Sequence, residues 1–228
     1  CYDISHLVTS TSMTPLRAYT RNFLLSVQQT TLDQHWLRVP FQVLRTLRAY
    51  EICSVPPGNK SGLTVGCLNA HSARDKADVI RDIVIDHDID ILALTETWLT
   101  TGKNDEFHVK GLSLPGYEFK HTPRPGNRGY GGVGVLHKAA IKIIKSNVYK
   151  ADSFENMQIK FNTGSLCLDL VTLYRPPKKS THDQFRKEFS TFLQDTVASS
   201  GDLLMVGDLN LHLDKKDDNN TRKFTELL

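Results

Sequence analysis

The sequence predicts an α/β fold, because strand-like and helix-like segments alternate along it. From residue 63 onward, apolar runs of strand length alternate with segments whose apolar residues recur at helical spacing. The chain has 228 residues, of which 39% are hydrophobic, so it can bury a sizeable core in one large domain or two small ones. It contains no apolar run of about 18 residues, so no transmembrane helix and no membrane partner is predicted.

The predicted strands are short apolar runs bounded by polar or turn residues. They span residues 63–69, 90–96, 131–138, 157–161, 166–175 and 203–210, and the turn Asn162-Thr163-Gly164 makes a hairpin of the fourth and fifth. Amphipathic helices are predicted over 73–88 and 182–197. Residues 100–130 are rich in Gly, Pro and Asn, and we expect mainly loops there, with at most a short strand near Tyr117.

Residues 1–60 differ from the rest of the chain. They hold six Lys/Arg against three Asp/Glu, whereas residues 61–228 hold 22 of each, so the formal charge of +3 arises in the N-terminal quarter. Near-helical spacing predicts a basic helix over 41–52, and SVPPGNKSG at 54–62 indicates a linker. We therefore expect a basic, partly helical and poorly ordered leader over 1–60 and a folded domain over 61–228. The basic helix is either a solvated surface helix or an arm that docks on a partner or on nucleic acid.

Polar side chains follow three of the apolar strands. Asn69 ends the first, Glu96 the second, and Asp208 with Asn210 the last. Carboxylate and amide oxygens suit a hard cation such as Mg²⁺, and such a cluster indicates metal-assisted attack on a phosphate ester. Each residue also has a plainer interpretation: a solvated turn for the carboxylates, and an Asx turn or helix cap for Asn69.

The glycines and cysteines match no cofactor or zinc motif. Gly131, Gly132 and Gly134 fit neither the P-loop nor the dinucleotide fingerprint and predict close strand packing. The four cysteines have spacings that fit neither zinc binding nor a dense disulfide framework. We interpret them as free thiols of an intracellular, reducing compartment.

Five motifs in order resemble the endonuclease/exonuclease/phosphatase family. They are CLNAHS (67–72), LTETWL (94–99), YGGVGV (130–135), LYRPP (173–177) and VGDLN (206–210). Their phrasing is most similar to the endonuclease domains that begin the reverse-transcriptase polyproteins of LINE-type, non-LTR retrotransposons. The resemblance covers about residues 63–228 and implies a four-layered α/β sandwich, in which two packed mixed β-sheets are flanked by helices.

The resemblance also implies a role for each motif residue. Glu96 is expected to be the principal Mg²⁺ ligand, with Mn²⁺ as a possible substitute, and Asn69 orders the metal site. Tyr174 leans on the scissile phosphate, Asp208 orients or activates the attacking water, and Asn210 steadies the phosphate. Tyr174 is alternatively a half-buried strand aromatic. DNA is the expected partner, and basic residues after the fifth motif strand are candidate contacts to its backbone, namely Arg175, Lys178 and Lys179.

The sequence departs from the family pattern after the GDLN motif. It stops 18 residues beyond Asn210, and none of its nine histidines lies in a Ser-Asp-His sequence, so no catalytic His is present. We expect a domain truncated after this motif, with an incomplete C-terminal part of the sandwich and weak or absent activity. The reverse transcriptase of the parent element is expected as a partner and is absent from this chain.

Three functions stay open. The first is a Mg²⁺-dependent endonuclease that nicks DNA and leaves a 3′-hydroxyl for reverse transcription. The second is a non-catalytic remnant or nucleic-acid-binding fragment of a retrotransposon protein. The third, a phosphatase or deadenylase of the same family, is disfavoured by the LINE-like phrasing of LTETWL and YRPP. The family resemblance alone implies that the protein acts on chromosomal DNA, and therefore in the nucleus.

Overall fold

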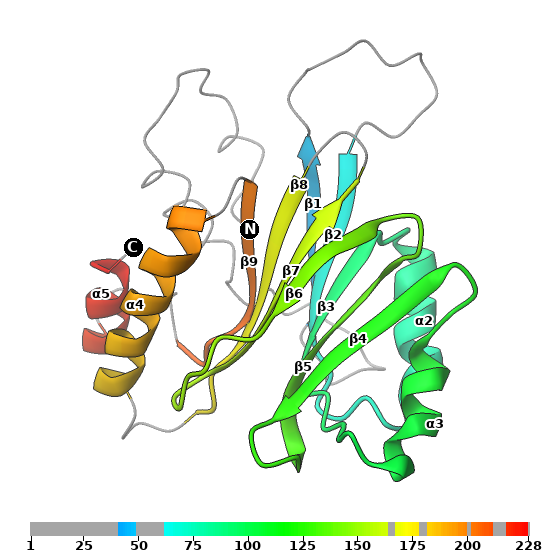
Figure 1. Cartoon of the computed structure of the whole chain (residues 1–228), viewed down its shortest axis with the longest axis horizontal. Coiled ribbons are helices and arrows are strands. Elements are labelled where there is room, and N and C mark those ends of the chain that lie inside the picture. Colours follow the sequence, from blue (N-terminus) through cyan, green and yellow to red (C-terminus); the bar gives the residue numbers. More distant parts are fainter. Residues whose placement is uncertain are drawn as a thin grey trace.

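The computed structural model describes residues 41–48, 62–163, 167–177, 182–199, 202–211 and 218–227. Two of the predicted DNA contacts, Lys178 and Lys179, lie outside these residues, as does most of the predicted leader. The described residues form two β-sheets and four helices (Figure 1).

The first sheet has five strands in the order β1-β2-β3-β5-β4. Only β2 and β3 run parallel within it, and the other neighbours are antiparallel. The strands are β1 (Phe41–Arg48), β2 (Gly62–Asn69), β3 (Ile91–Thr95), β4 (Tyr117–Arg124) and β5 (Arg128–Lys138).

The second sheet has four strands in the order β6-β7-β8-β9. Its single parallel pair is β8 with β9, and the connection between these two strands contains helix α4. The strands are β6 (Lys142–Asn147), β7 (Glu155–Asn162), β8 (Cys167–Tyr174) and β9 (Asp202–Asp208).

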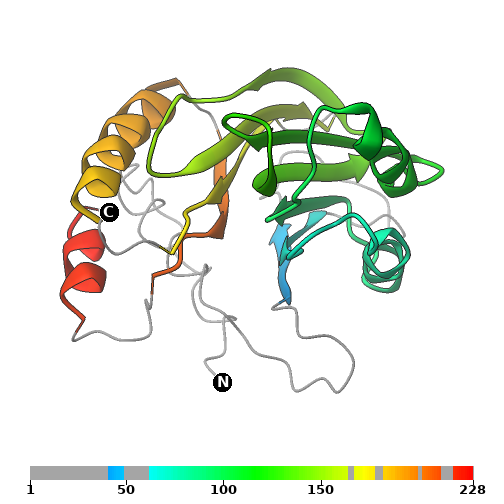
Figure 2. The same ribbon diagram turned by 90° about the horizontal axis from the view of Figure 1, so that it is seen from below.

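The helices cover the outer faces of the two sheets, which makes four layers. Helices α2 (Ala77–Asp86) and α3 (Lys103–Leu112) pack on the first sheet. Helices α4 (His182–Ser199) and α5 (Asn219–Thr225) pack on the second, and Figures 1 and 2 show the two helix pairs on opposite sides of the molecule. The predicted four-layered sandwich is therefore confirmed. Within the described part of the chain, every helix is too short or too polar to cross a membrane.

Strand periodicity explains how the layers hold together. Successive side chains of β3 point to opposite faces, so Ile91 and Ala93 join the core between the sheets while Leu92 and Leu94 pack under α2 and α3. All four side chains are fully buried. Strands buried on both faces read as continuous apolar runs, which is why the sequence predicted β3 and β9 clearly.

The prediction of a basic helix over 41–52 is wrong over Phe41–Arg48, which forms β1. This strand pairs with β2 from Phe41 opposite Leu68 to Arg48 opposite Gly62. Apolar residues at 41, 43, 44 and 47 fit helical and strand spacing about equally, so the pattern does not decide between them. Pairing decides it, because a strand at this place satisfies the backbone groups along the edge of β2. The first sheet thus contains strands from both sides of the predicted linker.

Residues 100–130 also differ from the prediction of mainly loops. They contain α3, which has Asp105 and Glu106 in its first turn, where acidic side chains stabilise a helix by interacting with its dipole. They also contain all of β4, an edge strand that tolerates Pro123 because one side of its backbone needs no partner. Strand β6 follows in a stretch for which no element was predicted.

The two parallel pairs bring four strand ends to one edge of the sandwich. Asn69 at the end of β2 is in register with Thr95 at the end of β3, and Tyr174 at the end of β8 is in register with Asp208 at the end of β9. The polar residues predicted at strand ends therefore gather where the two sheets face each other.

Gly207 allows β9 to reach this edge. Its φ angle is +147°, and a Cβ added there would lie 1.8 Å from the carbonyl oxygen of Leu173 on β8. The residue before Asp208 must therefore lack a side chain for the two strands to pair in this register.

We expect Gly207→Ala to lower the free energy of unfolding by about 3 kcal/mol or more, because the methyl group forces β9 away from β8. Gly111→Ala is the matched control, since a Cβ there would meet only the Ala77 Cβ at 3.5 Å, an ordinary contact. The control is expected to be neutral or stabilising, because Gly weakens a helix. Urea unfolding of both variants checks this, and equal midpoints for the two would contradict it.

Candidate active site

The predicted residues converge at the shared edge of the two sheets. Asn69 ends β2, Glu96 follows β3, Tyr174 ends β8 and Asp208 ends β9. Asn210 follows two residues later in the turn after β9. The ends of rigid strands and the residues directly after them thus hold these side chains near one another, as precise chemistry requires.

Asn69 links the two carboxylates. Its Nδ2 donates to Glu96 Oε1 at 2.9 Å and to Asp208 Oδ2 at 2.8 Å. One amide nitrogen thus bridges a residue of the first sheet and a residue of the second. The Asn69 Oδ1 accepts from the His71 amide at 3.1 Å, so the Asx turn considered from the sequence also forms.

The backbone at Glu96 is strained and held from both sides. Glu96 has a φ angle of +51° and Trp98 one of +58°, values that residues other than Gly rarely adopt. The Ser72 amide donates to the Glu96 carbonyl at 2.9 Å, and the Trp98 amide donates to the Gly131 carbonyl at 2.8 Å. Such strain persists only where surrounding contacts enforce it, and it is typical of functional turns.

Two aromatic rings lie beside Glu96. The indole nitrogen of Trp98 is 3.4 Å from Glu96 Oε2, and the His71 ring packs against the Trp98 ring at 4.6 Å between centroids. The second carboxylate oxygen of Glu96 therefore has a donor of its own, separate from Asn69.

Tyr174 is buried, with 5% of its surface exposed. Burial raises the pKa of its hydroxyl well above the ordinary range, and the charge of Glu96 and a hydrogen bond to it raise the pKa further. The hydroxyl is therefore protonated at neutral pH. Since an ionised carboxylate only accepts, Tyr174 donates to Glu96.

Arg124 and Glu155 extend the site and were not predicted from the sequence. Glu155 starts β7 in register with Tyr174, and its carboxylate accepts from the Arg124 guanidinium and from the Gly132 amide. The guanidinium also lies 5.8 Å from the centre of the Tyr174 ring. Burial raises the pKa of Glu155, while Arg124 and the Gly132 amide oppose that rise.

A sequence signal for this pair was present in the glycines. A Cβ at Gly131 would lie 2.6 Å from the Arg124 Nε and 2.7 Å from Glu155 Oε1, so the glycine makes room for the ion pair. A Cβ at Gly134 would lie 2.8 Å from the Phe119 ring. The predicted close approach at these glycines is confirmed, although side chains rather than backbones are the nearest neighbours.

Arg175 does not lie where a DNA contact was expected. The residue is 1% exposed, and its guanidinium donates to the Leu209 carbonyl at 3.2 Å and to His182 Nδ1 at 3.0 Å. It also lies over the Phe185 ring, 4.8 Å from its centre. A side chain enclosed in this way is not available to a nucleic-acid backbone, so we correct that prediction.

Asn210 faces the same turn. Its backbone amide donates to Asp208 Oδ1 at 2.9 Å, and its Nδ2 donates to the Arg175 carbonyl at 2.7 Å. Asp208 thus has each carboxylate oxygen engaged, one by Asn210 and one by Asn69. Residues of both sheets therefore fix the orientation of the Asp208 carboxylate.

The donor set fits a hard divalent cation. Glu96 Oε1 and Asp208 Oδ2 accept from the same nitrogen, so they are separated by no more than the sum of two hydrogen bonds. Within the described residues, no group of three or more His, Cys, Asp or Glu side chains is arranged to hold a metal. A cation here would therefore be coordinated by one or two carboxylates and keep several waters, as Mg²⁺ usually does in proteins.

The loop after Glu96 is anchored by Asp105 at the start of α3. Its carboxylate accepts from the Arg74 guanidinium at 2.8 and 3.1 Å and from the backbone and hydroxyl of Thr100 at 2.7 and 2.6 Å. The hydrogen bonds from Arg74 hold the pKa of Asp105 well below its usual range, and those from Thr100 act in the same direction. This buried acid fixes the far end of the segment that carries Glu96 and Trp98.

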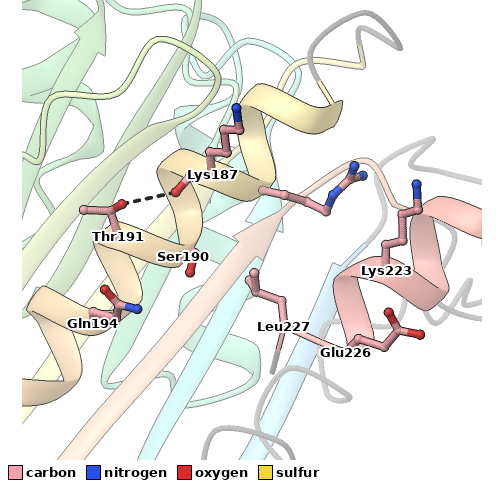
Figure 3. A pocket seen from close by; sticks show the side chains of 8 residues that line it. Lys187, Ser190, Thr191, Gln194, Lys223, Glu226 and Leu227 are labelled. Atoms are coloured by element: carbon pink, nitrogen blue, oxygen red, sulfur yellow. Dashed lines mark hydrogen bonds between the residues drawn. The ribbon is translucent and has the colours of Figure 1, made fainter.

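A shallow hollow of about 600 Å³ lies between α4 and the α5 region (Figure 3). Its walls carry Arg186, Lys187, Lys223 and Glu226 together with small polar side chains. None of the residues gathered at the strand ends lines it, so the hollow is separate from the candidate active site.

Comparison with known families identifies the class. The Endonuclease/Exonuclease/phosphatase family matches residues 65–228, and the chain belongs to this family. The resemblance seen in the five motifs is therefore confirmed.

One curated relative comes from a mobile element. The RNA-directed DNA polymerase from mobile element jockey of Drosophila melanogaster is 24% identical over 137 residues. The match covers 60% of this chain and 14% of that protein. The chain thus spans a small part of the length of this relative.

Solved structures share the fold at low sequence identity. An AP endonuclease from Archaeoglobus fulgidus is 17% identical with a TM-score of 0.53, covering 72% of this chain and 69% of that one. A mannosyl-6-phosphatase from Bacteroides thetaiotaomicron is 14% identical with a TM-score of 0.55, covering 72% of this chain and 70% of that one. At these identities the likeness concerns the fold alone.

Asp105→Asn is expected to lower the free energy of unfolding at pH 7 by roughly 2–3 kcal/mol, because it removes the charge that Arg74 and Thr100 stabilise. A lowered folded-state pKa gives stability that is present above the unfolded value, about pH 4, and lost as the pH falls through the folded value. The difference in free energy of unfolding between the wild type and Asp105→Asn should therefore become smaller below about pH 4.

Urea unfolding from pH 7 to pH 3 measures this gap. Asp82→Asn, at an exposed position of α2, is the matched control and should change stability by less than about 0.5 kcal/mol. A gap that stays constant with pH would show that the Asp105 charge does not anchor the loop.

Proposed function

We propose that this chain is a metal-dependent phosphodiester hydrolase that nicks DNA for a retrotransposon. The nick leaves a 3′-hydroxyl from which the reverse transcriptase of the parent element, a partner outside this sequence, primes synthesis. The observation that carries the proposal is the single Asn69 amide that joins Glu96 and Asp208 at the shared sheet edge. The jockey relative supports the mobile-element context.

Glu96 is the proposed metal ligand, and Asn69 orients it. When bound, Mg²⁺ or Mn²⁺ would polarise a phosphoryl oxygen and neutralise the charge that develops in the transition state. Asn69 and the Trp98 indole each hold one oxygen of Glu96, so the carboxylate is oriented before any cation arrives. Such preorganisation avoids a reorganisation cost at the moment of reaction.

Asp208 is the proposed base. Water attacks phosphorus and gives one proton to Asp208, while its second proton stays on the product phosphate. The bond from phosphorus to the 3′-oxygen breaks, and the 3′-oxygen takes a proton from solvent water to leave as the hydroxyl. Asn210 holds one oxygen of Asp208 through its backbone amide and stands beside it to steady the phosphate. The role of a base requires the Asp208 carboxylate to be aimed into the site, which its two separate hydrogen bonds support.

Tyr174 supplies a neutral donor. Because its pKa is raised, the hydroxyl stays protonated next to Glu96. It can turn its proton from Glu96 to an entering phosphate oxygen without adding negative charge. Arg124, whose guanidinium lies over the Tyr174 ring, places a positive charge beside this donor. Lys178 and Lys179 stay predicted contacts to the DNA backbone.

Nicking of supercoiled plasmid tests the proposal. We expect open-circular DNA with Mg²⁺, none with chelator, and a loss of at least about 100-fold for Glu96→Gln, which keeps the size of the side chain but removes the charge that binds metal. Glu106→Gln, on the exposed side of α3, is the matched control and should nick as the wild type does.

A parallel assay on small phosphate monoesters separates the proposal from a phosphatase. Turnover of monoesters with intact plasmid would favour the phosphatase. Folded protein that neither nicks DNA nor hydrolyses monoesters would contradict the enzymatic proposal and favour a non-catalytic fragment. Nicking that persists in Glu96→Gln would remove Glu96 from the metal site.

A further inference from the structure

Arg175 contacts each of the three consecutive residues Asp208, Leu209 and Asn210 at the end of β9 and in the turn after it. Its backbone amide donates to the Asp208 carbonyl at 2.8 Å. Its guanidinium Nη1 donates to the Leu209 carbonyl at 3.2 Å, and its own carbonyl accepts from Asn210 Nδ2 at 2.7 Å. A single residue of the neighbouring strand end thus contacts the whole Asp-Leu-Asn turn.

The other side of the guanidinium is held by α4. Nη2 lies 3.0 Å from His182 Nδ1, and the Phe185 ring centre lies 4.8 Å from the guanidinium carbon. Because a guanidinium group only donates, His182 Nδ1 is the acceptor of this hydrogen bond. The planar fork of Arg can reach the Leu209 carbonyl and His182 together, which the point charge of Lys cannot.

The turn that Arg175 contacts needs such support. Asn210 has a φ angle of +49°, and Leu209 is 3% exposed, so its carbonyl has little access to water. A buried carbonyl without a donor costs about 1–3 kcal/mol. The guanidinium supplies that donor and thereby favours the left-handed conformation that directs Asn210 back toward Asp208.

We infer that Arg175 is a positioning residue of the active site, which fixes Asp208 and Asn210 through the Leu209 carbonyl and does not contact DNA. The inference rests on the proposed function for its catalytic consequence. Its structural consequence, an ordered turn after β9, is independent of any activity.

The catalytic consequence is tested with Arg175→Met and Arg175→Lys on a labelled DNA duplex. For Arg175→Met we expect kcat to fall about 10- to 100-fold with KM within about twofold, since misplacing the reacting groups by an ångström costs rate rather than binding. Arg175→Lys restores one donor and should recover part of the loss. Arg186→Met, which removes an arginine of α4 whose guanidinium pairs with Asp183 on the same helix, should match the wild type.

The structural consequence is tested by amide hydrogen exchange in the same four proteins. In Arg175→Met the segment 208–211 should exchange about tenfold faster, the equivalent of one lost hydrogen bond, while β3 and β5 keep their protection. Arg175→Lys should lie between, and it remains informative if the Met variant does not fold.

The outcomes separate the two proposals. A raised KM with unchanged kcat would assign Arg175 to DNA binding and overturn the inference. Unchanged exchange over 208–211, or faster exchange across all strands, would overturn it as well. If the wild-type chain does not cleave DNA, the proposed function fails, and the exchange pattern alone decides the role of Arg175.

Discussion

The amide of Asn69 is the contact on which the candidate site depends. It donates to one carboxylate from each sheet, and without a donor or a cation between them Glu96 and Asp208 would repel each other at the seam of the sandwich. The Asn69 amide therefore links the two sheets at the point where the chemistry is proposed. The remaining contacts, from Trp98, Tyr174 and Asn210, fix the orientation of carboxylates that Asn69 has already brought together.

The sequence predicted the parts of the molecule that are governed by apolar periodicity. Strands such as β3 and β9 are buried on both faces, so their apolar runs are unambiguous. Polar groups after buried strands suggested Glu96, which follows β3, and Asp208, which ends β9, and the resemblance of the motifs to the family gave them their expected roles as site residues. The structure brings both to Asn69.

Long-range contacts were beyond the reach of the sequence pattern. Arg175 follows Tyr174 in a motif that suggested an exposed cation, yet the fold of the Leu209 turn over it encloses the side chain. Glu155 lies in a stretch with no distinguishing spacing, and its pairing with Arg124 of β4 depends on how the two sheets pack on each other. Strand β1 likewise depends on the edge that β2 offers rather than on its own periodicity.

The bond between Asn69 and Asp208 joins residues 139 positions apart in the chain. Because closing so long a loop costs chain entropy before the contact forms, we expect the contact to form after local helices and hairpins. During synthesis the first sheet leaves the ribosome well before β9, and Glu96 and Asp208 are brought together only when β9 docks. Docking of β9 is thus the step that completes the candidate site.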